Sequence, residues 1–530
     1  MSTEHFDVLI LGAGLSGIGA ACHLTRECPG KSYAILEGRD AIGGTWDLFR
    51  YPGIRSDSDM YTLGYSFKPW TNPKVIADGP SIRDYINETA DEYNVRPNIR
   101  FGHHILGANW CSETARWTVQ TRRTSDDELV EFSAGFVIAC TGYYKYANGY
   151  TPEFPGREQF KGQIIHPQLW PEDLDYTGKR VVIIGSGATA VTLVPSMTDK
   201  AAHVTMLQRS PSYVATVPLE DPISVQLRRF LPEKLVYRLA RTRNVALQML
   251  VYRLSKSRPG MMRRLLLKQV QWQLGKDYDM SHFSPSYNPW DERLCAVPNG
   301  DLFKVLKKGK ASVVTDQIET FNETGIKLKS GQQLDADIII TATGLELELL
   351  GGAEIRVDDK PFDLSQATAY KALMLSDLPN AAMIFGYTNA SWTLKADISC
   401  EYICRLLKHM DETGTRICVP RAPGDLVERP FLDMQSGYVQ RAQHKFPKQG
   451  DRAPWKLKQN YAFDLAMLRY SKLNDGSVEF TNPKPVAKPA AKASAKPSAK
   501  KAPAKAKAAK KNAAAKGTTG KAKGATQASA

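Results

Sequence analysis

The chain has 530 residues, of which 42% are hydrophobic and 24% charged, so it is long enough to bury a large core and to hold about three or four domains. Its formal charge of +15 is concentrated after residue 481, where 13 lysines occur without any arginine, aspartate or glutamate. The preceding residues carry 57 basic and 55 acidic side chains. The net charge therefore gives no reason to regard the whole chain as a nucleic-acid-binding protein.

The cysteine content and the first residues exclude further classes of protein. The eight cysteines include no Cys-x-x-Cys pair, which disfavours a dithiol redox centre or a zinc ribbon, and no metal site is expected. Eight cysteines in so long a chain are typical of a reduced, intracellular protein, so we expect it in the cytoplasm. A strand-like run begins at residues 7–10 and no run of about 18 apolar residues occurs, so neither a secretory signal nor a membrane-spanning helix is expected.

Short apolar runs alternate with helical patterns from the N-terminus onward, which is typical of a mostly parallel α/β sheet. Strands are predicted at residues 6–11 and 32–36, with a helix at residues 15–25 between them. A β-rich stretch covers residues 117–136. Further strands are predicted at residues 136–140, 180–184, 203–207, 337–341 and 382–386. The strand–glycine–helix pattern of the start recurs at residues 180–190, which predicts two nucleotide sites.

The first glycine-rich turn, Gly12-Ala-Gly14-Leu-Ser-Gly17, follows an apolar strand and opens a helix. Gly12 permits a tight turn, Gly14 lets the backbone approach a pyrophosphate, and Gly17 lets the helix and strand pack closely. Glu37 ends the next strand 20 residues after Gly17, where a carboxylate can bind the ribose hydroxyls of an adenine dinucleotide. The sequence therefore predicts a dinucleotide-binding unit here.

The second glycine-rich turn contains Gly185, Gly187 and Ala190 in the same arrangement. The acid expected after its next strand is missing, and Arg209 and Ser210 stand there instead. A 2′-phosphate would be attracted by an arginine and repelled by a carboxylate, which favours NADP over NAD. An acid at one site and a base at the other indicate FAD at the first unit and NADPH at the second.

We predict two Rossmann-like dinucleotide-binding domains interrupted by a helical insertion and followed by a disordered tail. The predicted limits are 1–145 and 336–481 for the FAD-binding domain, 146–215 and 286–335 for the NADP-binding domain, 216–285 for the insertion and 482–530 for the tail. Residues 223–276 of the insertion carry 13 basic side chains and the single acid Glu233. The insertion could cover the substrate site or lie as a basic amphipathic surface on an anionic membrane. The tail could bind a polyanion or a membrane, or be an inert solubilising extension.

A third motif lies between the two glycine-rich turns, and its spacing has no evident physical reason by itself. Its defining residues are Phe160, Gly162, His166, Trp170 and Pro171. The pattern F-x-G-x-x-x-H-x-x-x-W-P resembles the fingerprint of type I Baeyer–Villiger monooxygenases. The related flavin-containing monooxygenases usually have tyrosine at its end.

The resemblance covers about residues 6–480 and includes two further motifs, at residues 43–57 and at residues 343–344. The family pattern implies that Gly44, Thr45, Trp46 and Asp57 of the first motif, and Thr343 and Gly344 of the second, contact the cofactor. The stretches 45–67, 288–303 and 386–397 are similar to members of the family that act on thioamides. The segment 389–392 could face the flavin or the substrate, or its tryptophan could belong to the core.

The resemblance implies a mechanism that uses FAD, NADPH and O₂. In this family NADPH reduces the flavin, O₂ adds to give a C4a-peroxyflavin, and the peroxide attacks a ketone to give an ester or a lactone. Sulfides or thioamides can be oxygenated as well. The protein orients the flavin, excludes water and stabilises negative charge.

The resemblance also assigns the charged groups of the reaction. The catalytic arginine of the family matches Arg293, and Asp57 matches the acid expected to pair with it beside the flavin. Glu292 stands where many relatives have lysine, which leaves Arg209 as the main determinant of NADPH preference. His166 and Trp170 are expected to govern the movement of the two domains.

Two alternatives remain open at this stage. One is an N- or S-oxygenating flavin-containing monooxygenase, against which the Trp170-Pro171 ending argues. The other is a polyanion- or membrane-binding scaffold that is not an enzyme. For the enzyme, the expected partners are a small ketone or sulfur-containing substrate and O₂, with the basic helices and tail available for a membrane or polyanion.

Overall fold

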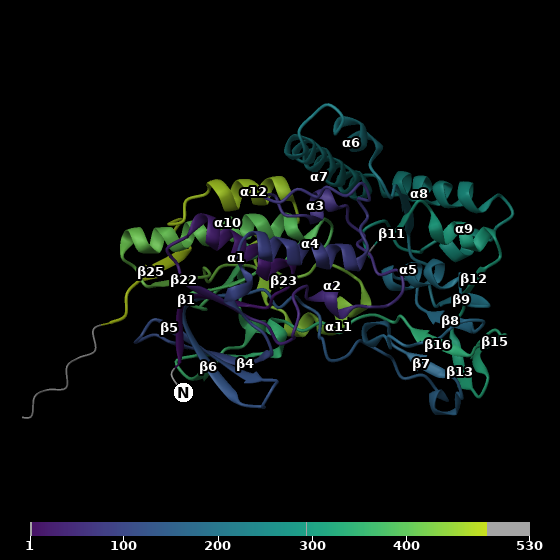
Figure 1. The fold of residues 1–530 in the computed structure, drawn as a ribbon, viewed down its shortest axis with the longest axis horizontal. Helices are drawn as coiled ribbons and strands as arrows, with labels where there is room; N and C mark the ends of the chain where they lie inside the picture. The colour runs from purple at the N-terminus through teal and green to yellow at the C-terminus, as the bar shows by residue number, and fades with distance from the viewer. Residues whose placement is uncertain (1–2, 293, 485–530) are drawn as a thin grey trace, which may run out of the picture. The chain divides into compact units, whose positions relative to one another are not determined.

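Two sheets organise the chain (Figure 1), and a glycine-rich turn follows one interior strand of each. The computed structural model describes residues 3–292 and 294–484, so the predicted catalytic Arg293 and nearly all of the predicted tail lie outside the described residues. The α/β class is confirmed. The residue limits of the predicted domains stay predictions.

The first sheet has a parallel centre and an antiparallel flank. Its strands, in spatial order, are β18 (Lys360–Pro361), β17 (Glu354–Val357), β4 (His103–Cys111), β5 (Arg116–Arg123), β6 (Leu129–Ala139), β1 (Glu4–Leu11), β2 (Tyr33–Leu36) and β3 (Ile99–Arg100), with β21 (Ala381–Met383) beside the end of β6. Ile10 of β1 lies opposite Ile35 of β2 and Ile138 of β6, and all three strands are parallel. Their carboxyl ends therefore lie side by side, although β6 is far from β1 and β2 in the chain. The strands predicted at the start of the chain are confirmed.

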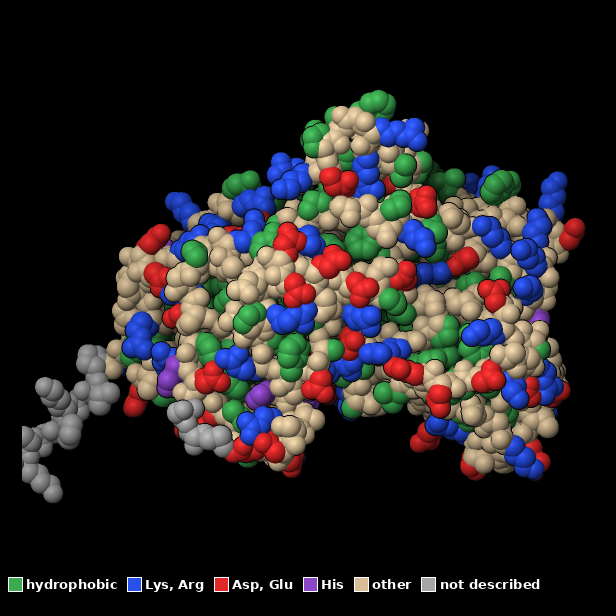
Figure 2. All heavy atoms as spheres, viewed as in Figure 1, with side chains coloured by type: hydrophobic (Ala, Val, Ile, Leu, Met, Phe, Trp, Pro, Cys, Tyr) green, Lys and Arg blue, Asp and Glu red, His purple; other side chains and the backbone are tan. Residues whose placement is uncertain are grey.

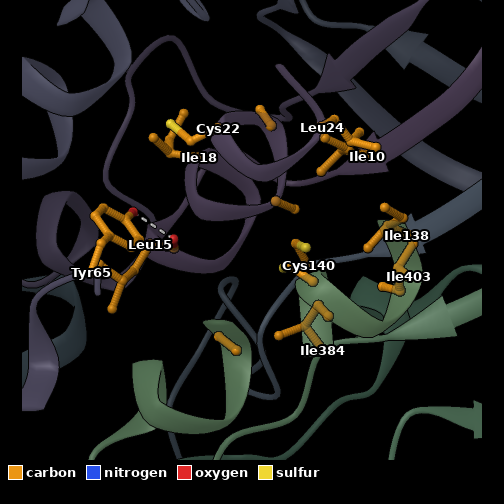
Figure 3. Close-up of a cluster of buried hydrophobic side chains, with 14 of the residues drawn as sticks. Ile10, Leu15, Ile18, Cys22, Leu24, Tyr65, Ile138, Cys140, Ile384 and Ile403 are labelled. Carbon is orange, nitrogen blue, oxygen red and sulfur yellow. Dashed lines mark hydrogen bonds between the residues drawn. The ribbon is translucent and has the colours of Figure 1, made fainter. Parts of the chain in front are cut away.

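One face of this sheet is covered by helices. These are α1 (Leu15–Glu27), α4 (Gly79–Glu92), α10 (Trp392–Thr413) and α12 (Tyr461–Tyr470). Figure 3 shows Ile18 and Cys22 of α1 in the same cluster as Cys140, Ile384 and Ile403. Each such side chain, when fully buried, contributes about 1.5–3 kcal/mol of transfer free energy. The glycine-rich turn before α1 is thereby held against the end of β6.

The opposite face buries large aromatic side chains. Trp110 and Trp117 of the antiparallel flank pack with Phe132, and Phe385 and Phe431 from the C-terminal part of the chain join the same cluster. Tryptophan and phenylalanine bury about 150–250 Å² each, so a few of them stabilise this layer. The sheet is therefore buried on both faces around its parallel centre, as parallel strands require.

The second sheet is smaller and entirely parallel. Its spatial order is β12 (Ala311–Thr315), β9 (His203–Gln208), β8 (Arg180–Ile184), β16 (Ile338–Thr341) and β7 (Gln163–Ile165). Helix α5 (Ala188–Met197) connects β8 to β9, and α9 (Asp301–Lys307) precedes β12. The strands predicted at residues 180–184, 203–207 and 337–341 are confirmed. We call the first sheet with its helices the first unit and the second sheet with its helices the second unit, which repeats the strand–turn–helix arrangement of the first.

Two linkers join the sheets, since the chain leaves the first sheet after β6 and returns after β16. Smaller elements complete the fold. They are α2 (Thr45–Leu48), α3 (Met60–Leu63), α11 (Gly437–Ala442), the strand pairs β10 (Val214–Val217) with β11 (Cys295–Pro298), β19 (Ala369–Tyr370) with β20 (Met374–Leu375), β22 (Ile417–Pro420) with β25 (Val478–Thr481) and β23 (Arg429–Pro430) with β24 (Lys448–Gln449), and the three-stranded sheet β13 (Ile318–Asn322), β14 (Gly325–Leu328) and β15 (Gln333–Asp335).

The predicted helical insertion contains three helices, α6 (Pro222–Leu227), α7 (Glu233–Ser257) and α8 (Pro259–Leu274). Helix α7 packs against α3 of the first unit, and α8 packs against α9 and β10 of the second (Figure 1). Among the helices of residues 3–292 and 294–484, none combines the length and the apolar character that a bilayer-spanning segment needs.

Candidate functional site

The first glycine-rich turn is tightly enclosed by its own backbone. A Cβ atom on Gly17 would lie 1.8 Å from the carbonyl oxygen of Gly12, and Gly12 itself has a φ of +100° and faces the carbonyl of Cys140. Helix α1 begins after Gly14, which supplies no side-chain cap. The N–H groups of the first helical turn therefore stay available to an anion such as a pyrophosphate.

Glu37 lies at the end of β2 and is 6% exposed. Its carboxylate accepts hydrogen bonds from the backbone N–H groups of Ala13 (2.7 Å) and Arg39 (2.9 Å), and burial raises its pKa above the usual value. Arg39 pairs with the buried Asp47, while its Nε is buried and has no partner among the described residues. An unpaired buried donor beside the glycine-rich turn fits a bound polar group here.

The second glycine-rich turn is enclosed at Gly185, where a Cβ atom would lie 2.4 Å from the carbonyl oxygen of Ala342, but it is open at its second glycine. Gly187 precedes α5 without a side-chain cap, and a Cβ atom added to it would meet nothing within 4 Å among the described residues. Arg209 and Ser210 follow β9 and are exposed. Burial raises the pKa of Glu292, and the charge of the nearby Arg209 acts in the opposite direction. A carboxylate therefore lies within electrostatic reach of the arginine predicted to bind the 2′-phosphate.

A cavity of about 300 Å³ lies between the two glycine-rich turns. The first unit lines it with the predicted residues Gly14, Gly44, Thr45, Trp46 and Asp57, and the second unit with Ala188 and Thr189 at the start of α5. A backbone hydrogen bond joins the first glycine-rich turn to the segment at Gly43 and Gly44, because Gly43 N–H donates to Ala13 C=O over 3.1 Å. Residues from both units thus face one space.

Aromatic side chains form the wall of this cavity. The rings of Tyr143 and Trp392 stack with centroids 5.2 Å apart and planes at 9°, and Trp392 Nε1 donates to Ser16 Oγ over 2.8 Å. Trp392 therefore lines the cavity as well as packing against the core. Such a wall gives the space between the two units an apolar side.

Tyr387 lines the same cavity and belongs to a buried polar group. Its hydroxyl donates to Asp464 Oδ2 over 2.8 Å, and Lys395 Nζ donates to the same oxygen over 3.0 Å. Burial lowers the pKa of Lys395, although Asp464 acts in the opposite direction. This ion pair fixes the position of the Tyr387 ring at the cavity wall.

His166 of the fingerprint motif connects the two linkers. Its Nδ1 accepts from the N–H of Gln168 (3.2 Å), so its Nε2 carries the proton and lies 3.2 Å from the carbonyl oxygen of Gly344 in the returning linker. The side chain of Gln168 donates to the carbonyls of Lys145 and Tyr146 in the outgoing linker. Burial lowers the pKa of His166, which keeps the ring neutral and this pattern intact.

The remaining fingerprint residues support this junction without lining the cavity. Phe160 is buried beside β16, and a Cβ atom on Gly162 would lie 2.4 Å from the carbonyl of Asp337. Trp170 packs against the core of the second unit, and Pro171 is exposed. The structure thus places the motif at the linkers.

Thr343 and Gly344, predicted to contact the cofactor, also lie in the returning linker. Thr343 Oγ1 donates to the carbonyl of Tyr150 over 2.7 Å, and the N–H of Tyr150 donates to Gly344. Their neighbour Leu345 lines the cavity. A cofactor contact by Thr343 or Gly344 stays a prediction.

Asp57 lies in a segment that is held by the helical insertion. Two residues further on, Asp59 caps α3 and accepts hydrogen bonds from Asn244 (2.9 Å) and Gln248 (3.1 Å) of α7. Leu63 of α3 lines the cavity beside Asp57. The insertion therefore contacts the wall of the candidate site directly, while the predicted partner of Asp57, Arg293, lies outside the described residues.

Four tyrosines that line the cavity, Tyr143, Tyr144, Tyr146 and Tyr387, were not predicted from the sequence. All four follow strand β6 or β21. These strands run parallel to β1, and their carboxyl ends lie beside the first glycine-rich turn. Because ligands of such sheets bind beyond the carboxyl ends of the strands, the strand order would have pointed to these tyrosines.

Comparison with known proteins places this site among flavin enzymes. Residues 65–383 match the flavin-binding monooxygenase-like family, and residues 10–74 match an NAD(P)-binding Rossmann-like domain. The FAD-containing monooxygenase EthA of Mycolicibacterium smegmatis is 56% identical over 482 residues, which cover 90% of this chain and 98% of that protein. The probable FAD-binding monooxygenase AlmA of Acinetobacter baylyi is 52% identical over 480 residues, which cover 90% and 96%.

Solved structures share the fold at lower identity. An oxidized steroid monooxygenase bound to NADP has a TM-score of 0.70 at 21% identity, covering 90% of this chain and 100% of that one. The OTEMO complex with FAD and NADP has a TM-score of 0.69 at 20% identity and covers 91% and 100%. These likenesses concern the arrangement of the two dinucleotide-binding units.

Proposed function

Because the chain belongs to the flavin-binding monooxygenase-like family, we propose that it is an FAD-dependent Baeyer–Villiger monooxygenase that consumes NADPH and O₂ and converts ketones to esters or lactones. The observation that carries the proposal is the cavity of about 300 Å³, which residues of both glycine-rich units line. A flavin bound by the first unit and a nicotinamide bound by the second would meet in this space.

The residues of the first unit fit a bound FAD. The uncapped start of α1 at Gly14 would hold the pyrophosphate, and the carboxylate of Glu37 and the unpaired Nε of Arg39 are available to the adenosine end. When bound, FAD takes two electrons from NADPH and activates O₂, so that one oxygen atom reaches the substrate and the other leaves as water.

The second unit fits NADPH. The open turn at Gly187 and the uncapped start of α5 would hold its pyrophosphate, and Arg209 and Ser210 would hold the 2′-phosphate. The aromatic wall of Tyr143 and Trp392 excludes water from the reacting atoms. We assign to Arg293 the stabilisation of negative charge at this point and to Asp57 the positioning of Arg293.

The fingerprint ending Trp170-Pro171 supports Baeyer–Villiger chemistry over N- or S-oxygenation, because the latter group usually ends the motif with tyrosine. The same cavity can admit a sulfide or a thioamide, whose sulfur atom is an alternative acceptor of oxygen. A panel of ketones and sulfides, analysed for oxygenated product as well as NADPH consumption, distinguishes the two activities. Sulfoxide without any ester or lactone from the wild type would contradict the Baeyer–Villiger proposal.

The role of Arg293 is tested by substitution. We expect Arg293→Ala to retain its flavin spectrum and NADPH oxidation but to lose ketone oxygenation and release hydrogen peroxide instead, because a fixed cation is missing where negative charge develops. Arg356→Ala in β17, an exposed arginine of a surface hairpin, is the matched control and should keep full ester formation. Normal ester formation by Arg293→Ala would overturn the assignment.

A further inference from the structure

Helix α7 is amphipathic with its polar face turned inward. Tyr237, Arg241, Asn244 and Gln248 follow one another at helical spacing on the side that packs against the first unit. Arg241 reaches the carbonyls of Tyr61 and Gly64 and pairs with the buried Asp397 at 3.1 Å. The helix is thus attached to the first unit by hydrogen bonds and one ion pair, together with the buried side chains of Val236, Tyr237 and Ala240. Most of its leucines lie elsewhere on the helix.

Four of the five leucines of α7 are exposed to solvent. Leu235, Leu239, Leu247 and Leu250 are each 43–55% exposed. Leu235, Leu239 and Leu250 lie on the side of the helix opposite to Gln248, and Leu247 lies on its flank. A surface helix normally buries such a stripe, so an exposed one indicates a surface that is covered by something else.

The neighbouring helices extend this apolar surface. Trp272 of α8 is 85% exposed, and Phe230, between α6 and α7, is 81% exposed. Met261 and Leu265 share the helical face of Trp272, and Ile223 of α6 is also exposed. Nine of the thirteen large hydrophobic side chains that are exposed in the described part of the chain belong to residues 223–272. We call this set the α6–α8 surface.

Basic side chains surround the α6–α8 surface. The exposed ones in this segment are Arg229, Lys234, Arg238, Arg253, Lys256, Arg258, Arg264 and Lys268. The single acid of residues 222–276, Glu233, pairs with Arg228 at 3.1 Å. Figure 2 shows green hydrophobic and blue basic side chains together along the top of the view, where Figure 1 places α6, α7 and α8.

The positive charge of the α6–α8 surface favours an anionic binding partner. A second copy of the chain docked face to face would bring two basic surfaces together, and the lysine-rich C-terminal segment has neither acids nor large apolar side chains to offer. An anionic lipid bilayer offers both complements, since its acyl boundary accepts Leu, Phe and Trp side chains while its head groups attract Lys and Arg.

We propose that the α6–α8 surface docks this enzyme on anionic membranes as a peripheral protein, with the leucines of α7, Phe230 and Trp272 inserted at the level of the head groups. The attachment is separate from the cavity, because these side chains point away from the unit that α7 holds. The proposal stands independently of the reaction that the cavity catalyses.

Co-sedimentation of the full chain with vesicles tests the proposal. The full chain should bind vesicles of phosphatidylglycerol and phosphatidylcholine more tightly than vesicles of phosphatidylcholine alone. The triple variant Phe230→Ser, Leu239→Ser, Leu250→Ser should bind the anionic vesicles about tenfold more weakly or worse, since it loses apolar burial but no charge. Its flavin content and NADPH oxidation should match the wild type, because all three side chains are exposed.

A matched control removes exposed apolar side chains elsewhere. Leu129→Ser, Val427→Ser, Tyr470→Ser replaces three such side chains outside the α6–α8 surface and should bind vesicles like the wild type. Equal binding by both triple variants, no binding by the wild type, or a change of oligomeric state in place of vesicle binding would each overturn the proposal.

Fluorescence of Trp272 separates this surface from the lysine-rich C-terminal segment. In vesicles with brominated acyl chains, the part of the emission that is absent from Trp272→Phe but present in the wild type should be quenched on binding. Quenching should persist at about 0.5 M salt, which screens purely electrostatic attachment through lysines. Vesicle binding with an unquenched Trp272 would show that another part of the chain makes the contact and would contradict the proposal.

Discussion

In the first glycine-rich turn a Cβ atom on Gly14 would lie 3.5 Å from the backbone of Gly44, whereas in the second turn a Cβ atom on the equivalent Gly187 would meet nothing within 4 Å among the described residues. The acid of the first unit, Glu37, is buried and bonded to the turn, while Arg209 of the second unit is exposed to solvent. The two units share a sequence pattern but differ in how far the protein closes around it.

This difference matches what each unit is proposed to bind. A flavin that stays bound through many cycles benefits from a closed site, because a flavin left exposed to solvent would be held more weakly. A nicotinamide cofactor that enters and leaves in each cycle needs an open approach and a charge that attracts it. The closure of each turn therefore predicts the lifetime of its complex, and the following changes test that relation.

The largest effect is expected from glycine-to-alanine substitutions at two positions that differ in the space around them, Gly17 of the first turn and Gly187 of the second. Gly17→Ala forces a backbone clash and should lower the free energy of unfolding by about 3 kcal/mol or more, with loss of bound flavin. Gly187→Ala should fold with a full complement of flavin and raise only the KM for NADPH. Flavin absorbance and thermal unfolding measure both outcomes, and a flavin-loaded, stable Gly17→Ala protein would show that the first turn is not closed at this position.

The helix that follows the first turn is held by buried charges, and its stability should depend on pH. Burial opposes the charge of His23, but hydrogen bonds to Asp397 (3.4 Å) and Glu27 (2.8 Å) outweigh it and raise its pKa from 6.5 to about 9. The protonated form is favoured in the folded protein, so this stabilisation is complete below pH 6.5 and is lost as the pH rises through 9. The expected loss is about 3 kcal/mol.

Urea denaturation of the flavin-loaded protein at pH 6.5 and pH 9 measures this loss. His23→Gln retains a polar side chain without the titration and should show a much smaller difference between the two pH values. A wild type whose denaturation midpoint is unchanged across this range would show that the buried charges do not hold α1. Helix α5 of the second unit packs through Val191, Val194 and Met197, so its attachment should be insensitive to pH.

Local constraints made the two units predictable from the sequence. The turns require glycine at positions where a Cβ atom would strike the backbone, and the strands on either side are apolar because both faces are buried. Gly14, Gly44, Trp46 and Asp57 of the motifs line the cavity, and their contacts with a cofactor stay a prediction. These patterns involve residues close together in the chain, so they can be recognised in the sequence without knowledge of the tertiary packing.

Contacts between distant segments were not predictable. Tyr387 and Lys395 meet Asp464 across 77 and 69 residues, and no periodicity links these positions. The inward polar face of α7 was also missed, because its partners, such as Asp59, lie in another part of the chain. Polar groups of this kind are paired by the tertiary fold, so a sequence shows only that they exist.

The connection between the closed and the open unit is tested at His166. Asparagine can replace Nδ1 as the acceptor for Gln168 but is too short to reach Gly344, whereas glutamine can donate to Gly344 from near the position of Nε2. We expect His166→Asn to lower the yield of oxygenated product per NADPH consumed about tenfold, and His166→Gln to keep most of it, because the linkers position the two cofactors.

The ratio of product to NADPH consumed distinguishes this positioning role from general destabilisation. Thermal unfolding and flavin content should be similar in the two variants. Equal yields from both variants would show that the contact with Gly344 does not couple the two units.

The smallest effect concerns the charge next to the open unit. Glu292 lies within electrostatic reach of Arg209, and at neutral pH its carboxylate opposes the binding of a 2′-phosphate. Glu292→Gln should therefore lower the KM for NADPH about threefold, as expected for a partly solvated charge, and leave the KM for NADH unchanged. Arg209→Ala should act in the opposite direction and more strongly.

Because burial raises the pKa of Glu292, acidification of the wild type neutralises this carboxylate. The difference in KM for NADPH between the wild type and Glu292→Gln should therefore shrink as the pH falls from 8 towards 5. A difference that stays constant over this range would mean that Glu292 does not act through its charge.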